Sequence, residues 1–72
     1  MIEWKEIYNI YKAVLGNFIT LSIAWESSGY RVSIIGTQSV TLKERFQEIE
    51  EAKKAAIRLA KRKINQALKE LE

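Results

Sequence analysis

The feature that most constrains this chain is a long amphipathic stretch over residues 47–71. Apolar residues recur in it at intervals of three and four, which places them along one side of a helix. Most of the remaining positions hold Lys, Arg, Glu or Gln, all of which favour helices. The apolar stripe consists of Ile49, Ala52, Ala55, Ala56, Leu59, Ala60, Ile64, Ala67, Leu68 and Leu71. A stripe this wide is typical of a helix that packs on a sheet, so the sequence predicts one long helix that covers a sheet.

Residues 18–36 predict the clearest part of that sheet, a hairpin of two strands. Residues 18–25 alternate strictly between two faces, and an apolar face returns over residues 30–36 after a turn at residues 26–29. Because side chains on one face of a strand are two residues apart, the register decides which of them become neighbours. The consistent pairing joins Trp25 with Tyr30, Ile23 with Val32 and Leu21 with Ile34. These six side chains share one face, which we predict to be the core.

The segment before this hairpin, residues 7–15, allows two interpretations. Its apolar residues have helical spacing and Gly16 could end a helix, yet Ile, Tyr and Val are abundant and favour a strand. We favour the strand, with Gly16 and Asn17 as a two-residue turn into the hairpin. This register places Lys12 beside the core residue Leu21, so we expect Lys12 to lie at an edge of the sheet and extend to solvent.

Residues 40–46 predict a further strand, because Val40, Leu42 and Phe46 continue the apolar face. As an alternative, residues 41–44 have the spacing of a capping box and would begin the helix early. The helix would then span about 45 Å, too long for a sheet of this size, so we retain the strand. The predicted fold class is α+β, with an antiparallel β-meander of three to four strands over about residues 7–46. One long C-terminal helix packs across one face, and residues 1–72 form a single domain.

The composition argues against an enzyme. The chain of 72 residues has no Cys and no His, which excludes disulfides, cysteine nucleophiles and histidine acid–base chemistry. Its three glycines stand apart, so they form no glycine-rich phosphate loop. We therefore predict no enzymatic activity, no catalytic residue, no cofactor and no metal.

Hydropathy and charge give weaker predictions about location and partners. No apolar run approaches the ~20 residues of a membrane span, and the N-terminus lacks the layout of a signal peptide. We therefore expect a cytoplasmic protein with no membrane partner. The net charge of +3 favours anionic partners such as nucleic acid only slightly.

The sheet face away from the helix is predicted to be open, and it is the first candidate binding surface. In the predicted register it holds cations, aromatic rings and hydroxyls but no acid. Nucleic-acid bases could stack on such rings while the cations meet phosphates. The alternative is an ordinary solvated face, although Leu15, Phe18 and Ile35 favour some contact surface there. The candidate binding residues are Tyr11, Phe18, Arg31, Lys43 and Arg45.

The helix carries a second cluster of positive charge. Its members are Lys53, Lys54, Arg58, Lys61, Arg62 and Lys63. Glu50 precedes Lys53 and Lys54 by three and four residues, the spacing of ion pairs on an exposed helix face. We interpret the cluster as a solvated helix face, with contact to nucleic acid as the alternative.

The predicted helix is longer than the predicted sheet. A helix of this length spans about 37 Å, whereas a strand of five to seven residues covers roughly 17–24 Å. The last turns should therefore project beyond the sheet with their apolar side exposed. A second copy of the chain is the simplest way to cover them, so we predict a homodimer. The candidate dimer contacts are Ile64, Leu68 and Leu71.

The order of these segments resembles a group of short hypothetical proteins found in phages and prophages. The shared pattern is an early Trp4, a Tyr11-x-Ala13 motif and two consecutive strands like residues 18–23 and 30–34. It closes with a helix that opens on Glu50-Glu51-Ala52-Lys53 and contains Ala55-Ala56. The resemblance covers nearly the whole chain and implies a small accessory protein of a mobile element.

The second half also resembles a double-stranded-RNA-binding domain, in which two strands precede a helix of similar spacing. Glu50 and Glu51 stand where that family carries phosphate-binding lysines, and the turn at residues 26–29 does not match its minor-groove loop. No site residues are therefore carried over. Taken together, the sequence predicts a non-enzymatic protein-interaction module, a phage or prophage accessory protein acting as a homodimer, with a host protein as a possible partner. The alternative is a small nucleic-acid-binding protein that uses the open sheet face.

Overall fold

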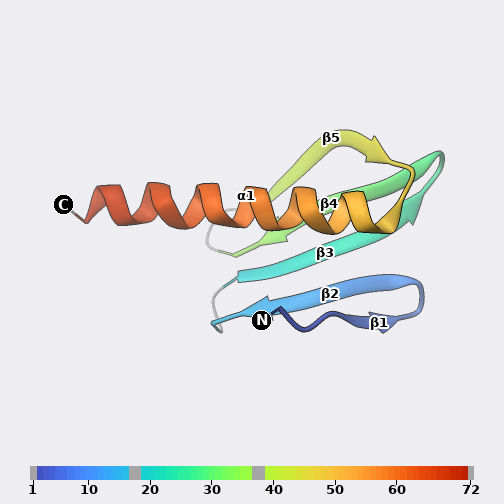
Figure 1. Ribbon diagram of the computed structural model, residues 1–72, viewed down its shortest axis with the longest axis horizontal. Helices are drawn as coiled ribbons and strands as arrows, with labels where there is room; N and C mark the ends of the chain where they lie inside the picture. The colour runs from blue at the N-terminus through green and yellow to red at the C-terminus, as the bar shows by residue number, and fades with distance from the viewer. Residues whose placement is uncertain (1, 17–18, 37–38, 72) are drawn as a thin grey trace.

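The computed structural model describes residues 2–16, 19–36 and 39–71, which form one antiparallel sheet with one helix across it (Figure 1). The sheet has five strands, one more than the upper number predicted, and the α+β class is confirmed. The elements in chain order are β1 (Lys5–Ile7), β2 (Ile10–Leu15), β3 (Ile19–Glu26), β4 (Gly29–Ile35), β5 (Val40–Phe46) and α1 (Ile49–Glu70). Every strand lies beside its neighbour in the sequence, so the sheet is a simple meander.

The β3–β4 hairpin has the predicted register. Trp25 lies opposite Tyr30, Ile23 opposite Val32 and Leu21 opposite Ile34. The chain reverses through residues 27–28, where Ser27 has a φ of 58°. Leu21, Ile23, Val32 and Ile34 are buried beneath α1, which confirms this face as the core.

The β2–β3 register differs from the predicted one by one residue. Ala13, rather than Lys12, lies opposite Leu21, and Lys12 lies opposite Ser22 on the other face. The observed register therefore buries a methyl group in the core and leaves the ammonium group in solvent, which avoids the desolvation of a charge. The prediction of a two-residue turn at Gly16 and Asn17 therefore implied the wrong register for β2 and β3. Asn17 itself lies outside the described residues.

The chain begins with a short hairpin of β1 and β2, which the sequence did not predict. The strand assigned to residues 7–15 is confirmed only from Ile10, because Tyr8 and Asn9 form a turn that joins β1 to β2. Both turn residues have positive φ, 51° for Tyr8 and 64° for Asn9. This combination matches the tight turn whose twist suits a two-residue hairpin.

The helix packs on β3 and β4, with a smaller contact to β5. Its buried positions are mostly alanines, which let the helix axis approach the sheet closely. The core is formed by Ala13, Leu21, Ile23, Val32, Ile34, Ala52, Ala56, Leu59 and Ala60. Ile2 and Trp4, which precede β1, are partly buried and pack against this cluster.

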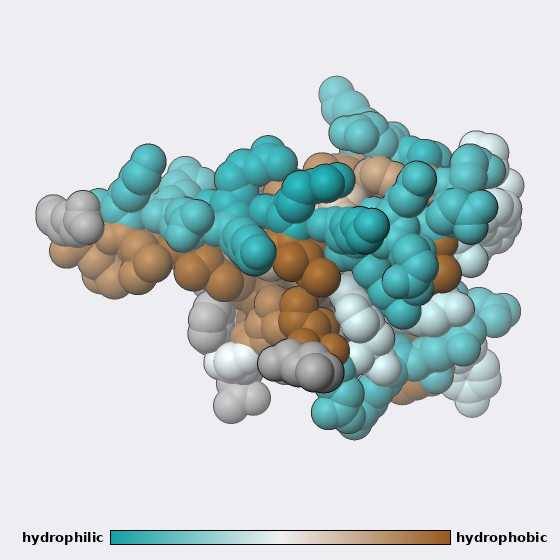
Figure 2. Space-filling model, in the orientation of Figure 1, coloured by the Kyte–Doolittle hydropathy of each residue, from teal (hydrophilic) through white to brown (hydrophobic). Residues whose placement is uncertain are grey.

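The helix extends well beyond the sheet, as predicted. Its 22 residues span about 33 Å, and its buried residues end at Ala60. Figure 1 shows the remaining turns projecting past the ends of β3 and β4. Figure 2 shows that the underside of this projection is hydrophobic while its upper side is hydrophilic. We call the segment from Lys61 to Leu71 the overhang. In the part of the chain that the structure describes, no helix is both long enough and apolar enough to cross a membrane.

Candidate functional site

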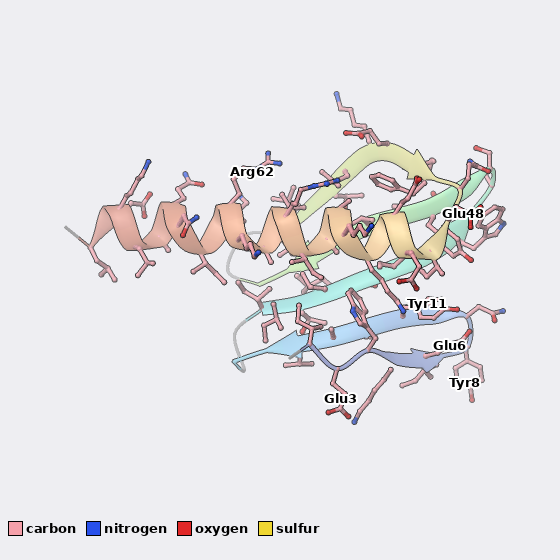
Figure 3. All side chains as sticks on the ribbon, in the orientation of Figure 1. Glu3, Glu6, Tyr8, Tyr11, Glu48 and Arg62 are labelled. Atoms are coloured by element: carbon pink, nitrogen blue, oxygen red, sulfur yellow. The ribbon has the colours of Figure 1, made fainter. Side chains whose placement is uncertain are left out.

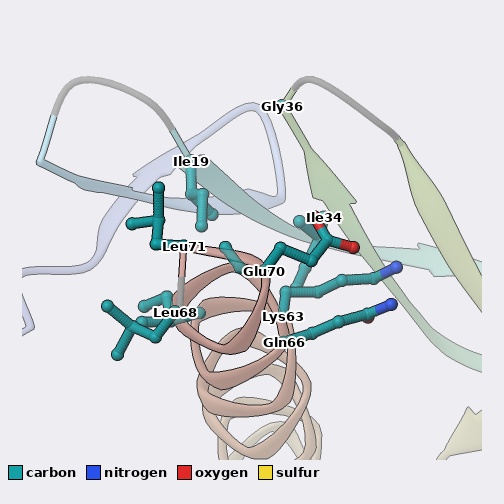
Figure 4. A pocket seen from close by; sticks show the side chains of 10 residues that line it. Ile19, Ile34, Gly36, Lys63, Gln66, Leu68, Glu70 and Leu71 are labelled. Atoms are coloured by element: carbon teal, nitrogen blue, oxygen red, sulfur yellow. The ribbon is translucent and has the colours of Figure 1, made fainter.

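The overhang forms an apolar groove with the end of the sheet. The groove has a volume of about 530 Å³, and helix residues make one wall while the ends of β3 and β4 make the other. Its lining consists of Ile19, Ile34, Gly36, Lys63, Ile64, Gln66, Ala67, Leu68, Glu70 and Leu71 (Figure 4). All three predicted dimer contacts are therefore brought together in one surface.

The side chains at the tip of this groove are exposed. Leu68 is 55% exposed and Leu71 is 83% exposed, so both present most of their apolar surface to water. Figure 2 shows hydrophobic residues on the underside of the overhang and on the neighbouring end of the sheet. Arg62 projects from the opposite, polar side of the helix (Figure 3). An exposed apolar surface beside a polar one is typical of a protein-contact site.

The two flanks of the overhang differ in chemistry. Figure 4 shows Leu68 and Leu71 on one side of the helix, and Lys63, Gln66 and Glu70 on the other. Lys63 and Glu70 are seven residues apart, so they lie on the same side two turns from one another. One flank is therefore apolar, and the other carries one positive and one negative charge.

The open sheet face brings Arg31 and Arg45 together, because the two residues lie opposite each other in β4 and β5. The prediction that this face holds no acid is wrong. Glu26 lies on it, and its carboxylate oxygens lie 2.9 Å from Arg31 Nη1 and 3.5 Å from Arg45 Nη2. Both arginines are therefore paired with an acid of the chain itself.

The other predicted members of this face are dispersed. Tyr11 lies opposite Ile23 and packs against the core on the helix side, so its placement on the open face is wrong. The one-residue change in register also moves Leu15 to the helix side and puts the exposed Val14 on the open face instead.

The remaining predicted members of the open face do not form a cluster. Lys43 lies in the irregular part of β5, and Phe18 lies outside the described residues. Ile35 is exposed on this face, separated from Val14 by Thr20.

A second hollow, which the sequence did not predict, lies on the helix side near the hairpin tips. It is lined by Glu6, Asn9, Tyr11, Trp25 and Tyr30, and it has a volume of about 430 Å³. The rings of Trp25 and Tyr30 meet edge to face, with centroids 4.9 Å apart. Partial burial raises the pKa of Tyr11, and the neighbouring Glu6 carboxylate adds to this effect through its charge and a hydrogen bond (Figure 3).

A cation of the helix already lies over the aromatic rings near this hollow. Lys53 Nζ lies 5.4 Å from the ring centroid of Tyr11 and 5.8 Å from that of Trp4. The same ammonium lies 3.6 Å from Glu50, one turn earlier in α1. These contacts give the hollow a structural use, because they fix the N-terminal segment against the helix.

Two further findings concern metal sites and known relatives. Among the described residues there is no cluster of three acidic, His or Cys side chains that could hold a metal ion. Comparisons with protein-family models, with curated proteins and with solved structures found no significant match to this chain.

Proposed function

We propose that this protein is a small protein-interaction module that acts as a homodimer joined through the overhang. The observation that supports this most directly is the exposure of Leu68 and Leu71 on the apolar side of a helix that continues past its own core. A helix that only needed to cover the sheet would become polar on all sides after Ala60. Here the apolar stripe continues through Ile64 to Leu71 instead.

The energetics favour a reversible dimer. Burial of apolar surface contributes about 25 cal/mol per Å², so covering the exposed apolar side of the overhang and the partly buried Ile19 stabilises the complex. Association also costs several kcal/mol in lost translational and rotational freedom. Because the overhang is only about 16 Å long, the surplus is small and dissociation should occur in the micromolar range.

The charge distribution favours a protein partner over nucleic acid. The groove is apolar along its centre, and the alternative site on the open face depends on Arg31, Lys43 and Arg45. Glu26 forms ion pairs with two of these three cations, and its single negative charge offsets one of their two positive charges, which weakens their attraction for phosphate. Tyr11, which was expected to provide a stacking surface, lies on the other side of the sheet.

The test is the solution mass measured by sedimentation over the micromolar range. The wild type should change from one chain to two with rising concentration. Leu68→Glu should shift it toward one chain, and Leu68→Glu with Leu71→Glu should do so more completely, because each places a carboxylate in the apolar contact. Circular dichroism should still report the sheet in both variants.

Asn65→Glu is the matched control, because it adds the same charge to an exposed position of the overhang that does not line the groove. It should leave the dimer unchanged. A wild type that has the mass of one chain at high micromolar concentration would contradict the proposal.

A further inference from the structure

The two flanks of the overhang differ in charge, and this difference restricts how two copies could pair. The inference rests on the proposed homodimer. Lys63 and Glu70 both line the groove on one flank, and Leu68 lies on the other. Ile64, Ala67 and Leu71 follow one another at the three- and four-residue spacing of a contact seam between two helices.

We infer that the overhangs of two copies pair antiparallel, with Lys63 of each copy beside the partner's Glu70. A two-fold axis that makes two helices antiparallel brings the same flank of both helices together. The charged flanks then meet, and one pair of Lys63 with Glu70 forms at each end of the contact. The apolar flanks meet on the other side, where Leu68 packs.

A parallel pair would be electrostatically worse. Its two-fold axis runs along the helices and brings opposite flanks together, so the flank of Lys63 and Glu70 would lie against the partner's Leu68. Two charged side chains would then lose water beside an apolar side chain, without gaining an ion pair. Charge complementarity therefore selects the antiparallel arrangement.

The pairing of Lys63 with Glu70 also sets the stagger of the helices. It places Ile64 opposite the partner's Ala67, twice by symmetry, so that a large side chain meets a small one. It places the partner's Leu71 near Ala60, where α1 leaves the sheet. This position is the inner end of the groove, so the partner's helix end would fill the space beside Ile19 and Ile34.

Two charge-reversal variants test this arrangement. In Lys63→Glu, each helix would carry Glu at both positions, and in Glu70→Lys it would carry Lys at both. Each variant alone should dissociate more readily than the wild type, by about ten-fold in Kd at low salt, because two attractive pairs become repulsive. An equimolar mixture should recover the wild-type affinity, because the two chains complement one another only as an antiparallel heterodimer.

Arg62→Glu is the control, because it reverses a charge on the polar side of the same helix (Figure 3) and should leave the Kd nearly unchanged. The recovery in the mixture should fade in high salt, which screens exposed ion pairs. If the wild type dimerises and mixing restores nothing, the antiparallel pairing is wrong while the homodimer stands. If the wild type does not dimerise, the proposed function itself fails.

Discussion

A carboxylate oxygen of Glu26 lies 2.9 Å from Nη1 of Arg31 across the tip of the β3–β4 hairpin. The other oxygen lies 3.5 Å from Arg45 on β5, so one acid joins three strands at the same end of the sheet. All three side chains are partly exposed, and each ion pair therefore contributes only about 0–1 kcal/mol to stability. Their larger effect is on the charge of the open face.

Glu26→Gln should make that face more attractive to polyanions. The change frees Arg31 and Arg45, so binding to single-stranded RNA should strengthen, and its dependence on salt should steepen by roughly one to two in log–log slope. Mobility shifts at several salt concentrations measure both quantities. Glu3→Gln removes the same charge from the exposed N-terminal segment and serves as the control. Equal effects of the two changes would show that only net charge matters.

Ile23→Ala should destabilise the fold by about 2–5 kcal/mol, because Ile23 is 0% exposed between β2, β4 and α1. Ser22→Ala, at the next position of the same strand but on the open face, should change stability by less than about 0.5 kcal/mol. Urea unfolding followed by circular dichroism gives both values. A more harmful Ser22→Ala would mean that the register of β3 is wrong.

Gly29→Ala should destabilise the β3–β4 hairpin by about 1–3 kcal/mol. An added Cβ would lie 2.8 Å from Cβ of Arg45 and 3.0 Å from the carbonyl oxygen of Phe46, so β5 must move away to accommodate it. Ser28→Ala changes the exposed neighbour and should be almost neutral. Thermal unfolding of the two variants compares them directly, and equal melting temperatures would contradict the close packing of β5.

Tyr8→Asn should stabilise the protein by about 0.5–1 kcal/mol. Tyr8 has a φ of 51° and is 94% exposed, so it has the backbone strain of a left-handed residue without the benefit of packing. Asn adopts this conformation more readily. Tyr8→Phe keeps the strain and should be neutral in the same unfolding measurement. If Tyr8→Asn proved destabilising, the exposed ring would have a role that this chain alone does not explain.

Tyr11 should make the protein sensitive to alkali. Its pKa is raised above the ordinary value of 10.0 by partial burial and then by Glu6, so the fold favours the neutral phenol. That contribution to stability is fully present below pH 10.0 and is lost as the pH rises through the higher pKa of the folded state. Tyr11→Phe should lack this loss. Unfolding as a function of pH, together with the phenolate absorbance, distinguishes the two proteins.

The alternation in β3 and β4 was sufficient to predict their register, because only one face of each strand is consistently apolar. In β2 the same reasoning failed, since apolar residues occupy both faces, as in the neighbours Val14 and Leu15. Only the placement of Lys12 distinguishes the two registers, and the solvation of its charge decides in favour of the one observed.

The projection of the helix beyond the sheet could be predicted from the sequence because helix length and apolar spacing are local properties. The pairing of Arg31 and Arg45 with Glu26 could not be predicted, because it depends on which strands place their side chains beside Glu26. The contact of Glu6 with Tyr11 likewise requires the β1–β2 turn, for which the only local signal is the tolerance of Asn9 for positive φ.

The overhang also has a consequence for the dynamics of the chain. The turns after Ala60 have no core of their own chain beneath them, so in an isolated copy their amides should exchange with solvent almost as fast as those of a free peptide. In the proposed dimer the partner protects them, and their exchange would slow as the protein concentration rises, while the amides near Ala56 would not respond. The cooperative folding unit would then include two chains at one end of the molecule and one chain at the other.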